Sequence, residues 1–239
     1  MITKPSITSL EEIADSLSTE ERALFQRIYT VTTTIGELRI PPSMQPWVRQ
    51  QFGSAEAVTK QKIVRVTNMV TYEEALFNRL RASRPIGVRD KNSIDAQLQQ
   101  ANEDDLFRYP LDDTPEDLFG RVVGKHCVTA SNIAKYDGLH SLVIFNDFNP
   151  LHFSREQVID YIDVGWEWAK RARAMKPQAK YFFFIWNCLW RAGASIDHGH
   201  AQVTLTSDRH YAKIEGLRHA ALSYRQNYGS NYFADLFQV

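Results

Sequence analysis

One stretch near the end of the chain, residues 191–202 (RAGASIDHGHAQ), constrains the fold more than any other. His198, His200 and Gln202 follow one another at every second position, so in an extended strand they share one face with Thr204. The opposite face carries small or apolar residues, namely Gly199, Ala201, Val203 and Leu205. This alternation is typical of a strand that is packed on one side and open on the other. We therefore predict a strand with three polar side chains on its open face.

The residues just before this stretch predict its partner strand. Residues 180–188 (KYFFFIWNC) form a nearly continuous apolar run that ends in Asn187 and is typical of a buried strand. Residues 191–195 (RAGAS) form a turn of small residues, where backbone N–H groups can approach an anion. The prediction is a hairpin that presents two imidazoles and an amide above an anion-binding turn. Taken alone, a His pair at this spacing also fits a metal-site fragment or a coincidence on the surface.

Residues 193–202 (GASIDHGHAQ) resemble the active-site segment of the galactose-1-phosphate uridylyltransferase family, part of the histidine-triad superfamily. That family carries the pattern G-[CA]-S-x-x-H-x-H-x-Q, which is met here at Gly193, Ala194, Ser195, His198, His200 and Gln202. The RAGAS segment is especially similar to the one in the related ADP-sugar and diadenosine-polyphosphate phosphorylases. The resemblance covers about residues 61–239, which correspond to the first of the two halves that are usual in the family.

The fold class that we expect is α+β. The resemblance implies a histidine-triad-like, mostly antiparallel sheet with helices on its outer face, placed in a nucleotide-binding domain at residues 61–239. Residues 1–60 are expected to be a separate helical N-terminal section, because Ser9 and Ser18 each precede a glutamate by three positions, as in a capping box. Strands are predicted at residues 61–70, 126–132 and 142–147, a short helix after residue 71, and another helix at residues 211–228.

The clearest predicted helix begins after Ser154, in a capping-box pattern with Gln157, and runs to about Met175 before Pro177. Its apolar residues repeat at intervals of three and four, which predicts one buried face. The members of that face are Val158, Ile159, Ile162, Trp166, Ala169 and Ala172.

The catalytic residues are expected to be His200, Gln202 and Ser195. The resemblance implies that His200 is the nucleophile that forms a nucleotidyl-histidine intermediate. A histidine attacks phosphorus when one ring nitrogen is unprotonated and the other is held by an acceptor, here a backbone carbonyl of the same segment. Gln202 is expected to hold the α-phosphoryl oxygens through its NH₂ group, with Ser195 and Asn187 on phosphate oxygens.

Substrate binding is also assigned to Arg81, Arg84, Asn132 and His198. Arg81, Arg84 and Pro85 match an R-x-x-R-P element of the family, which implies contacts with substrate phosphates; by charge alone they also fit a solvated basic face. Asn132 resembles an asparagine that lies at the base and ribose of the nucleotide, although near Gly138 it also fits a turn-forming residue.

The resemblance implies a structural zinc site in which His140 and His198 are two of four ligands. The Cys-x-x-Cys that normally supplies the others is missing, because residues 106–109 read LFRY. Two imidazoles without thiolates make a weak zinc site, so we expect local hydrogen bonds instead and leave zinc as an open alternative.

Composition bounds the partners and the compartment. The chain has 28 basic and 28 acidic residues, so no basic excess indicates a nucleic-acid partner. Two cysteines make no disulfide framework, and the longest mainly apolar run is shorter than the roughly 20 residues that span a bilayer. We therefore expect a cytoplasmic protein without membrane or nucleic-acid partners.

The function expected from the resemblance is transfer of NMP from an NDP-sugar or dinucleoside polyphosphate to a sugar phosphate or phosphate. The alternatives are a phosphorylase or hydrolase of ADP-sugar or diadenosine polyphosphate, and a catalytically inactive nucleotide-binding protein. Because the resemblance covers only the first of the two halves that are usual in a member of the family, a homodimer is one way to supply the groups of the second half.

Overall fold

The computed structural model describes residues 7–69, 71–83 and 105–237. The chain divides into two compact units, one of residues 1–33, 64–77 and 208–239 and one of residues 34–63 and 78–207. Helices and two antiparallel sheets make it an α+β protein, which confirms the predicted class. His198, His200 and Gln202 all lie in the second unit, which is therefore the unit that positions the predicted site.

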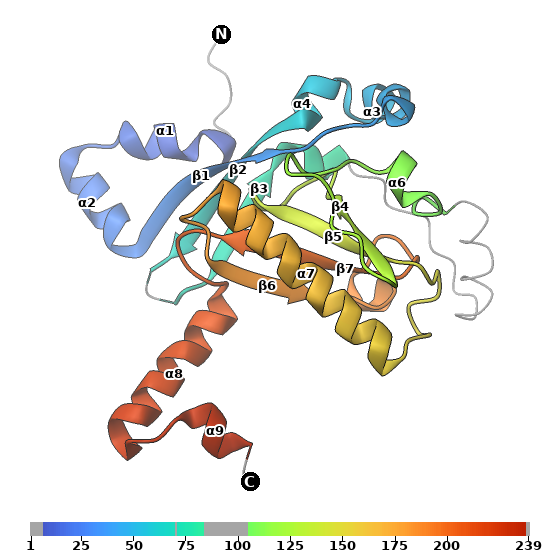
Figure 1. Ribbon diagram of the computed structural model, residues 1–239. Helices are drawn as coiled ribbons and strands as arrows, with labels where there is room; N and C mark the ends of the chain where they lie inside the picture. Colours follow the sequence, from blue (N-terminus) through green and yellow to red (C-terminus); the bar gives the residue numbers. More distant parts are fainter. Residues whose placement is uncertain (1–6, 70, 84–104, 238–239) are drawn as a thin grey trace. The chain divides into compact units, whose positions relative to one another are not determined.

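The second unit is built around a four-stranded antiparallel sheet in the order β4-β5-β7-β6 (Figure 1). The strands are β4 (Cys127–Ser131), β5 (His140–Phe145), β6 (Tyr181–Ile185) and β7 (His200–Thr206). β6 pairs with β7 so that Ile185 lies opposite Gln202, which confirms the predicted pairing of these two runs. β7 is also paired with β5, so both of its edges are hydrogen-bonded and its register is fixed.

The helix α7 (Arg155–Met175) lies across one face of this sheet (Figure 1). Ser154 caps it as predicted. Its hydroxyl accepts the N–H of Gln157, and the Gln157 side chain accepts the N–H of Ser154. The buried cluster between helix and sheet includes Trp168 from α7 and Val203 from β7.

The face of α7 that meets the sheet differs from the predicted one. The prediction was right for Ala169 and Ala172, but Ile159, Ile162 and Trp166 are 43%, 49% and 54% exposed. The buried residues are Tyr161, Val164, Gly165, Trp168, Ala169 and Ala172. Apolar residues occur on both sides of this helix, so their spacing alone does not select a face. Gly165 allows the close approach, because a Cβ there would lie 3.2 Å from the side chains of Phe184 and Val203.

Alternate residues of the same strands form the opposite face, which we call the histidine face. It carries His140, His200 and Gln202, together with the apolar residues Leu142 and Ile144. A small cluster packs there, made of Phe107, Ala130, Leu142 and Ile144 with Ile196 against it.

The described part of the second unit also contains short helices. They are η2 (Pro42–Met44), α3 (Gln45–Phe52), α4 (Ala55–Thr59), η3 (Arg79–Ser83), α6 (Pro110–Asp113) and η4 (Trp190–Ala192). α3 and α4 contribute Val48 and Val58 to a separate buried cluster with Leu38. This cluster gives the part of the unit before β4 a core of its own.

The first unit contains η1 (Ile7–Ser9), α1 (Leu10–Asp15), α2 (Thr19–Ile28), α8 (Ala212–Tyr228) and α9 (Tyr232–Leu236). The second sheet has the order β1-β2-β3, and its strands are β1 (Tyr29–Glu37), β2 (Lys60–Asn68) and β3 (Glu74–Asn78). The predicted strand at residues 61–70 and helix at 211–228 are confirmed.

Two local predictions in this region were wrong. Residues 1–60 are not helical throughout, because β1 lies among their helices. Residues 31–35 (VTTTI) are all β-branched, which favours a strand over the helical continuation that was expected after α2. The helix expected after residue 71 is the strand β3. No helix within the described ranges is both long and apolar enough to cross a membrane.

Candidate active site

The predicted alternation of side chains along β7 is present in the structure. Ala201, Val203 and Leu205 belong to the core under α7, so His200 and Gln202 point to the opposite, histidine face. His198 precedes the strand, and its neighbour Gly199 donates its N–H to the Phe148 carbonyl. The hairpin therefore confirms the alternation along β7, but the prediction of an open face was wrong. His198 and His200 are each 6% exposed, because Phe107 and its apolar neighbours cover this face, and of the three polar residues only Gln202 is partly exposed.

Gly199 separates the two histidines because only hydrogen fits there. A Cβ at this position would lie 2.7 Å from Cδ2 of Phe145 and 2.9 Å from the backbone oxygen of Asp147. The Gly199 carbonyl also accepts the N–H of Phe145, which ties this residue to the end of β5. The close approach of two backbones fixes where His198 and His200 emerge.

The tautomer of His200 is fixed by its own segment. Its Nδ1 lies 2.8 Å from the backbone oxygen of His198, and a carbonyl can only accept, so the proton is on Nδ1. Nε2 then carries the lone pair. No hydrogen-bond partner is found for it among the residues that the structure describes. The expectation that a backbone carbonyl of this segment orients the ring agrees with this geometry.

Burial keeps the His200 ring neutral. Its side chain is 6% exposed, and desolvation lowers the pKa of His200 below its usual value. The ring of Phe107 meets it edge-on with a centroid separation of 5.6 Å. A neutral imidazole with a bare, fixed nitrogen is the form that attacks an electrophilic phosphorus.

His198 is held at both ring nitrogens. Nδ1 lies 2.8 Å from a carboxylate oxygen of Asp105, and Nε2 lies 2.8 Å from the backbone oxygen of Phe145. The carbonyl requires a proton on Nε2, and the short contact to Asp105 requires a second proton between those two groups. Asp105 and His198 therefore form a buried pair that is neutral as a whole. This pair is connected to His200 through the backbone, because the His198 carbonyl accepts the Nδ1–H of His200.

Asp105 was not identified from the sequence. The side chain of Asp105 is only 3% exposed. An acidic residue followed by Leu106 and Phe107 has no local pattern that indicates a partner 93 positions away. Phe107, two residues after Asp105, contacts both His198 and His200 edge-on, so this segment is part of the site.

His140 has the opposite tautomer to His200. Its Nδ1 accepts the backbone N–H of Tyr136 at 3.1 Å, so the proton of the neutral ring is on Nε2. That nitrogen lies 2.9 Å from the amide oxygen of Gln202 and donates to it. Burial, and next the charge of Lys135, lower the pKa of His140 well below its usual value, so this ring also stays neutral.

The amide of Gln202 is oriented by that contact. Because its oxygen faces His140, its NH₂ group points the other way, and no partner for it is found within the described part of the chain. The side chain is partly exposed. This leaves a neutral hydrogen-bond donor two residues along the same strand face from His200, or about 7 Å at strand spacing.

Asn132 lies beside His140 and shapes the turn that follows β4. Its Oδ1 accepts the N–H of Ala134 at 3.0 Å, which is the turn role that the sequence left open. Its Nδ2 lies 3.3 Å from Nε2 of His140, but a protonated nitrogen has no lone pair to accept this donor. The structure thus places Asn132 at the site, and its predicted contact with a nucleotide stays a prediction.

The bend before His198 differs from the predicted anion-binding turn. The N–H groups of Ala192 and Ala194 donate to the Leu189 carbonyl, and that of Gly193 donates to the Trp190 carbonyl, so all three are used within the bend. The bend depends on left-handed backbone at Leu189 (φ 61°) and Gly193 (φ 95°).

Two predicted phosphate ligands lie at this bend. The amide nitrogen of Asn187 would lie 3.8 Å from a Cβ placed on Gly193, so these two residues are brought together. Ser195 is exposed. The N–H groups of residues 192–194 are engaged within the bend, and the side chains of Asn187 and Ser195 stay our predicted anion contacts.

Of the predicted arginines, Arg81 is placed and Arg84 lies outside the described residues. Arg81 is in η3, donates from Nη1 to the Ala134 carbonyl at 2.9 Å, and lies over the ring of Tyr136. It therefore supports the turn that carries His140, and its proposed phosphate contact stays a prediction.

The residues implied as zinc ligands do not fit a metal. Both nitrogens of His140 and of His198 are engaged with protein groups, which leaves neither ring a lone pair for a cation. Within residues 7–69, 71–83 and 105–237, no group of three or more His, Cys, Asp or Glu is placed to hold one. Both histidines are hydrogen-bonded to protein groups at each ring nitrogen, and no step below uses a metal.

Comparisons of the chain with protein-family models, with curated proteins and with solved structures found no match.

Proposed function

We propose that this chain is a nucleotidyltransferase that acts on an NDP-sugar or dinucleoside polyphosphate through a covalent nucleotidyl intermediate on His200. The observation that supports this proposal most is the difference between the two nitrogens of the His200 ring. Nδ1–H is bound to the His198 carbonyl, and no hydrogen-bond partner of Nε2 is found among the described residues. A ring fixed in this way is prepared to attack without first losing a proton.

The two steps balance without proton transfer at the ring. In the first, the Nε2 lone pair attacks the α-phosphorus, a P–N bond forms, and the bridging P–O bond breaks with its electron pair on the departing phosphate. The phosphorylated ring keeps Nδ1–H and becomes a cation, which the His198 carbonyl stabilises. In the second, a phosphate oxygen of the acceptor attacks the same phosphorus, and the P–N electron pair returns to Nε2.

We assign neutral hydrogen-bond donors to the charge that develops at the phosphoryl group. The NH₂ group of Gln202 is directed away from His140 and is available for an α-phosphoryl oxygen. Asn187 and Ser195, at the bend before His198, are the further donors that we assign to phosphate oxygens. Positioning and charge stabilisation of this kind account for most of the catalysis in phosphoryl transfer.

The arrangement of β4 to β7 with α7 on one face is compatible with the histidine-triad-like fold that the resemblance implies. If the chain acts as one half of such an enzyme, a second copy in a homodimer is our proposed source of the groups that the other half supplies.

Labelling tests the covalent intermediate directly. Purified protein is incubated with α-³²P-labelled UDP-, ADP- and GDP-sugars and diadenosine polyphosphates, and protein-bound label is measured after denaturation. We expect wild type and the exposed-site control His152→Asn to carry acid-labile, alkali-stable label, as a phosphoramidate does, and His200→Asn to carry none. Label that persists in His200→Asn would exclude this residue as the nucleophile.

A chase identifies the acceptor. Labelled enzyme is mixed with a sugar phosphate, with inorganic phosphate, or with neither, and the released nucleotide is identified. Release only with a sugar phosphate supports the transferase, and release with phosphate or water alone indicates the phosphorylase or the hydrolase. Saturable nucleotide binding without label or release indicates a binding protein without turnover and overturns the proposal.

A further inference from the structure

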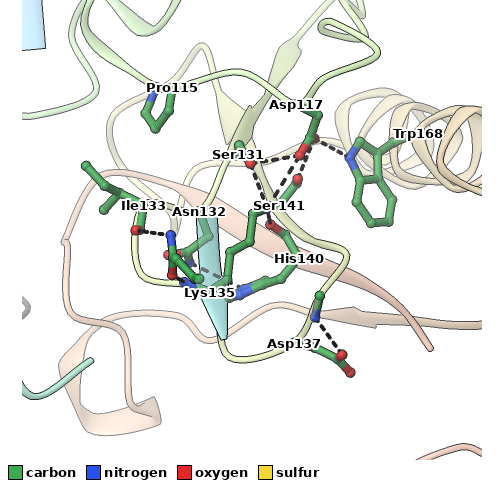
Figure 2. Close-up of polar contacts among 12 residues, drawn as sticks. Pro115, Asp117, Ser131, Asn132, Ile133, Lys135, Asp137, His140, Ser141 and Trp168 are labelled. Carbon is green, nitrogen blue, oxygen red and sulfur yellow. Dashed lines mark hydrogen bonds and ion pairs between the residues drawn. The ribbon is translucent and has the colours of Figure 1, made fainter. Parts of the chain in front are cut away.

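A lysine is buried in the turn between β4 and β5, next to the site. Lys135 is 1% exposed, and its ammonium donates to the backbone oxygen of His140 at 2.6 Å and to the hydroxyl of Ser131 at 2.7 Å (Figure 2). Its counter-ion is Asp117, at 3.5 Å. A cation that is fully enclosed by protein has to be paired and hydrogen-bonded, as this one is.

Asp117 ties this turn to the rest of the unit. One of its oxygens accepts from Ser131 at 2.7 Å; the other accepts from Ser141 at 2.5 Å and from Nε1 of Trp168 at 2.7 Å (Figure 2). Ser131 ends β4, Ser141 belongs to β5, and Trp168 is on α7. The carboxylate therefore connects two strands and the covering helix at the point where the turn begins and ends.

The other end of the turn holds the ring of His140. The Tyr136 N–H donates to Nδ1, and Lys135 itself is anchored at its backbone N–H by Gln61, at 3.1 Å. Gly36 leaves room for the lysine, since a Cβ there would lie 2.6 Å from Cδ of Lys135. Backbone and ring of His140 are thus fixed separately, the first by Lys135 and the second by Tyr136.

A glutamine amide needs a neighbour to choose its orientation, because its oxygen and nitrogen ends have nearly the same shape. With the amide reversed, two donors would face each other at His140, and the carbonyl oxygen of Gln202 would face the substrate. An oxygen directed at an anionic phosphoryl group repels it, whereas an NH₂ group binds it. The direction of this single contact therefore decides whether Gln202 can assist.

We infer that His140 is a positioning residue whose Nε2–H sets the Gln202 amide with its NH₂ group toward the phosphoryl group, and that the buried Lys135–Asp117 pair holds the turn that aims His140. The role of Gln202 toward phosphate rests on the proposed function. The orientation of the amide does not, because it follows from the contacts of His140 alone.

The kinetic test uses a double-mutant cycle on the rate of His200 labelling in a single turnover. His140→Gln keeps a donor near the position of Nε2, and His140→Phe keeps the ring volume without any donor. We expect His140→Phe to slow labelling by about 10- to 100-fold while its affinity for the nucleotide substrate stays unchanged. His140→Gln should restore most of the rate. In a Gln202→Leu background, His140→Phe should have no further effect.

The inference is overturned if His140→Phe labels at the wild-type rate, or if it slows labelling as much in the Gln202→Leu background as in wild type. The second result would indicate a general structural role.

A measurement without catalysis separates this inference from the proposed function. Ring ¹⁵N shifts, recorded on wild type and on His200→Asn, should show His140 protonated at Nε2 and, in wild type, His200 protonated at Nδ1. If none of the ³²P-labelled nucleotides labels the protein but His140 is protonated at Nε2, the proposed function fails and the amide orientation stands. Protonation of His140 at Nδ1 overturns the inference whatever the activity.

Discussion

The two faces of the four-stranded sheet are made by alternate residues of the same strands, yet they are built on different rules. Under α7, Ala201 and Val203 pack into an apolar core, and the buried carboxylate of Asp117 accepts hydrogen bonds at both of its oxygens. On the histidine face, polar rings lie among apolar residues such as Ile144 and Phe107. One face is closed by packing, and the other is ordered by hydrogen bonds.

The difference teaches where chemistry remains available. On the histidine face, His140 and His198 have both ring nitrogens engaged, whereas His200 and Gln202 each have one end engaged and one end without a partner in the described part of the structure. The engaged ends fix the direction of the others. The packed face should therefore control stability, and the histidine face should control labelling with smaller effects on stability.

Replacing the largest buried side chain under α7 gives the largest expected loss of stability. Trp168 is fully buried and donates to Asp117, so Trp168→Ala should lower the free energy of unfolding by about 3–5 kcal/mol. Trp168→Phe keeps most of the volume and should lower it by about 1–3 kcal/mol, through the lost donor. Urea denaturation measures both. His200→Asn, which we expect to abolish labelling, should change the free energy of unfolding by less than about 1 kcal/mol. A loss as large as that of Trp168→Ala would contradict the contrast between the faces.

Lys135→Met tests the buried ion pair that links the two faces. Removal of the ammonium leaves Asp117 as an uncompensated buried charge, so we expect a loss of about 3–5 kcal/mol in the free energy of unfolding. The double variant Lys135→Met with Asp117→Asn removes both charges and should recover most of that loss. If the double variant is no more stable than Lys135→Met, the two groups are not coupled and the pair does not hold the turn.

The features of the fold and site that the sequence alone predicts are those that depend on residues close together in the chain. The Ser154 cap, the pairing of β6 with β7, and the shared face of His200 and Gln202 all follow from residues a few positions apart. Where apolar residues surround an element, as on α7, local spacing is ambiguous. There a long-range contact selected the face, namely the close approach of Gly165 to Val203.

The partners that order the site are beyond local patterns. Asp105 meets His198 across 93 positions, and Asp117 meets Trp168 across 51. In the sequence, nothing distinguishes Lys135 from its polar neighbours Tyr136 and Asp137. Such pairs exist because the folded chain brings them together, and nothing in the residues beside them records it.

The pH dependence of the free energy of unfolding tests whether the histidines of the histidine face are buried and neutral. Burial lowers the pKa of both His140 and His200, while in the unfolded chain each binds a proton near pH 6.5. Below that pH the unfolded state therefore binds more protons, so stability falls as pH falls. Each histidine contributes up to about 1.4 kcal/mol per pH unit. Urea denaturation between pH 7.5 and 5.0 should show full stability above about pH 7 and a loss below about pH 6.5. His140→Gln should reduce the slope; an unchanged slope in His140→Gln would contradict a neutral, buried His140.

The smallest expected effect comes from one methyl group between the two histidines. In Gly199→Ala the new Cβ would meet Phe145 and the backbone of Asp147, and the backbone atom cannot move aside, so a loss of about 1–3 kcal/mol is expected. The matched control is Gly216→Ala in α8, where nothing lies within 4 Å and the free energy of unfolding should rise by up to about 1 kcal/mol.

Because the strain in Gly199→Ala lies between His198 and His200, it should also disturb the carbonyl that fixes the His200 tautomer. Labelling should then slow by more than the lost stability explains at a temperature where the variant is fully folded. If Gly199→Ala is destabilised but labels at the wild-type rate, the backbone approach at Gly199 serves packing alone, and the ordering of His200 has to come from Phe107 and Asp105.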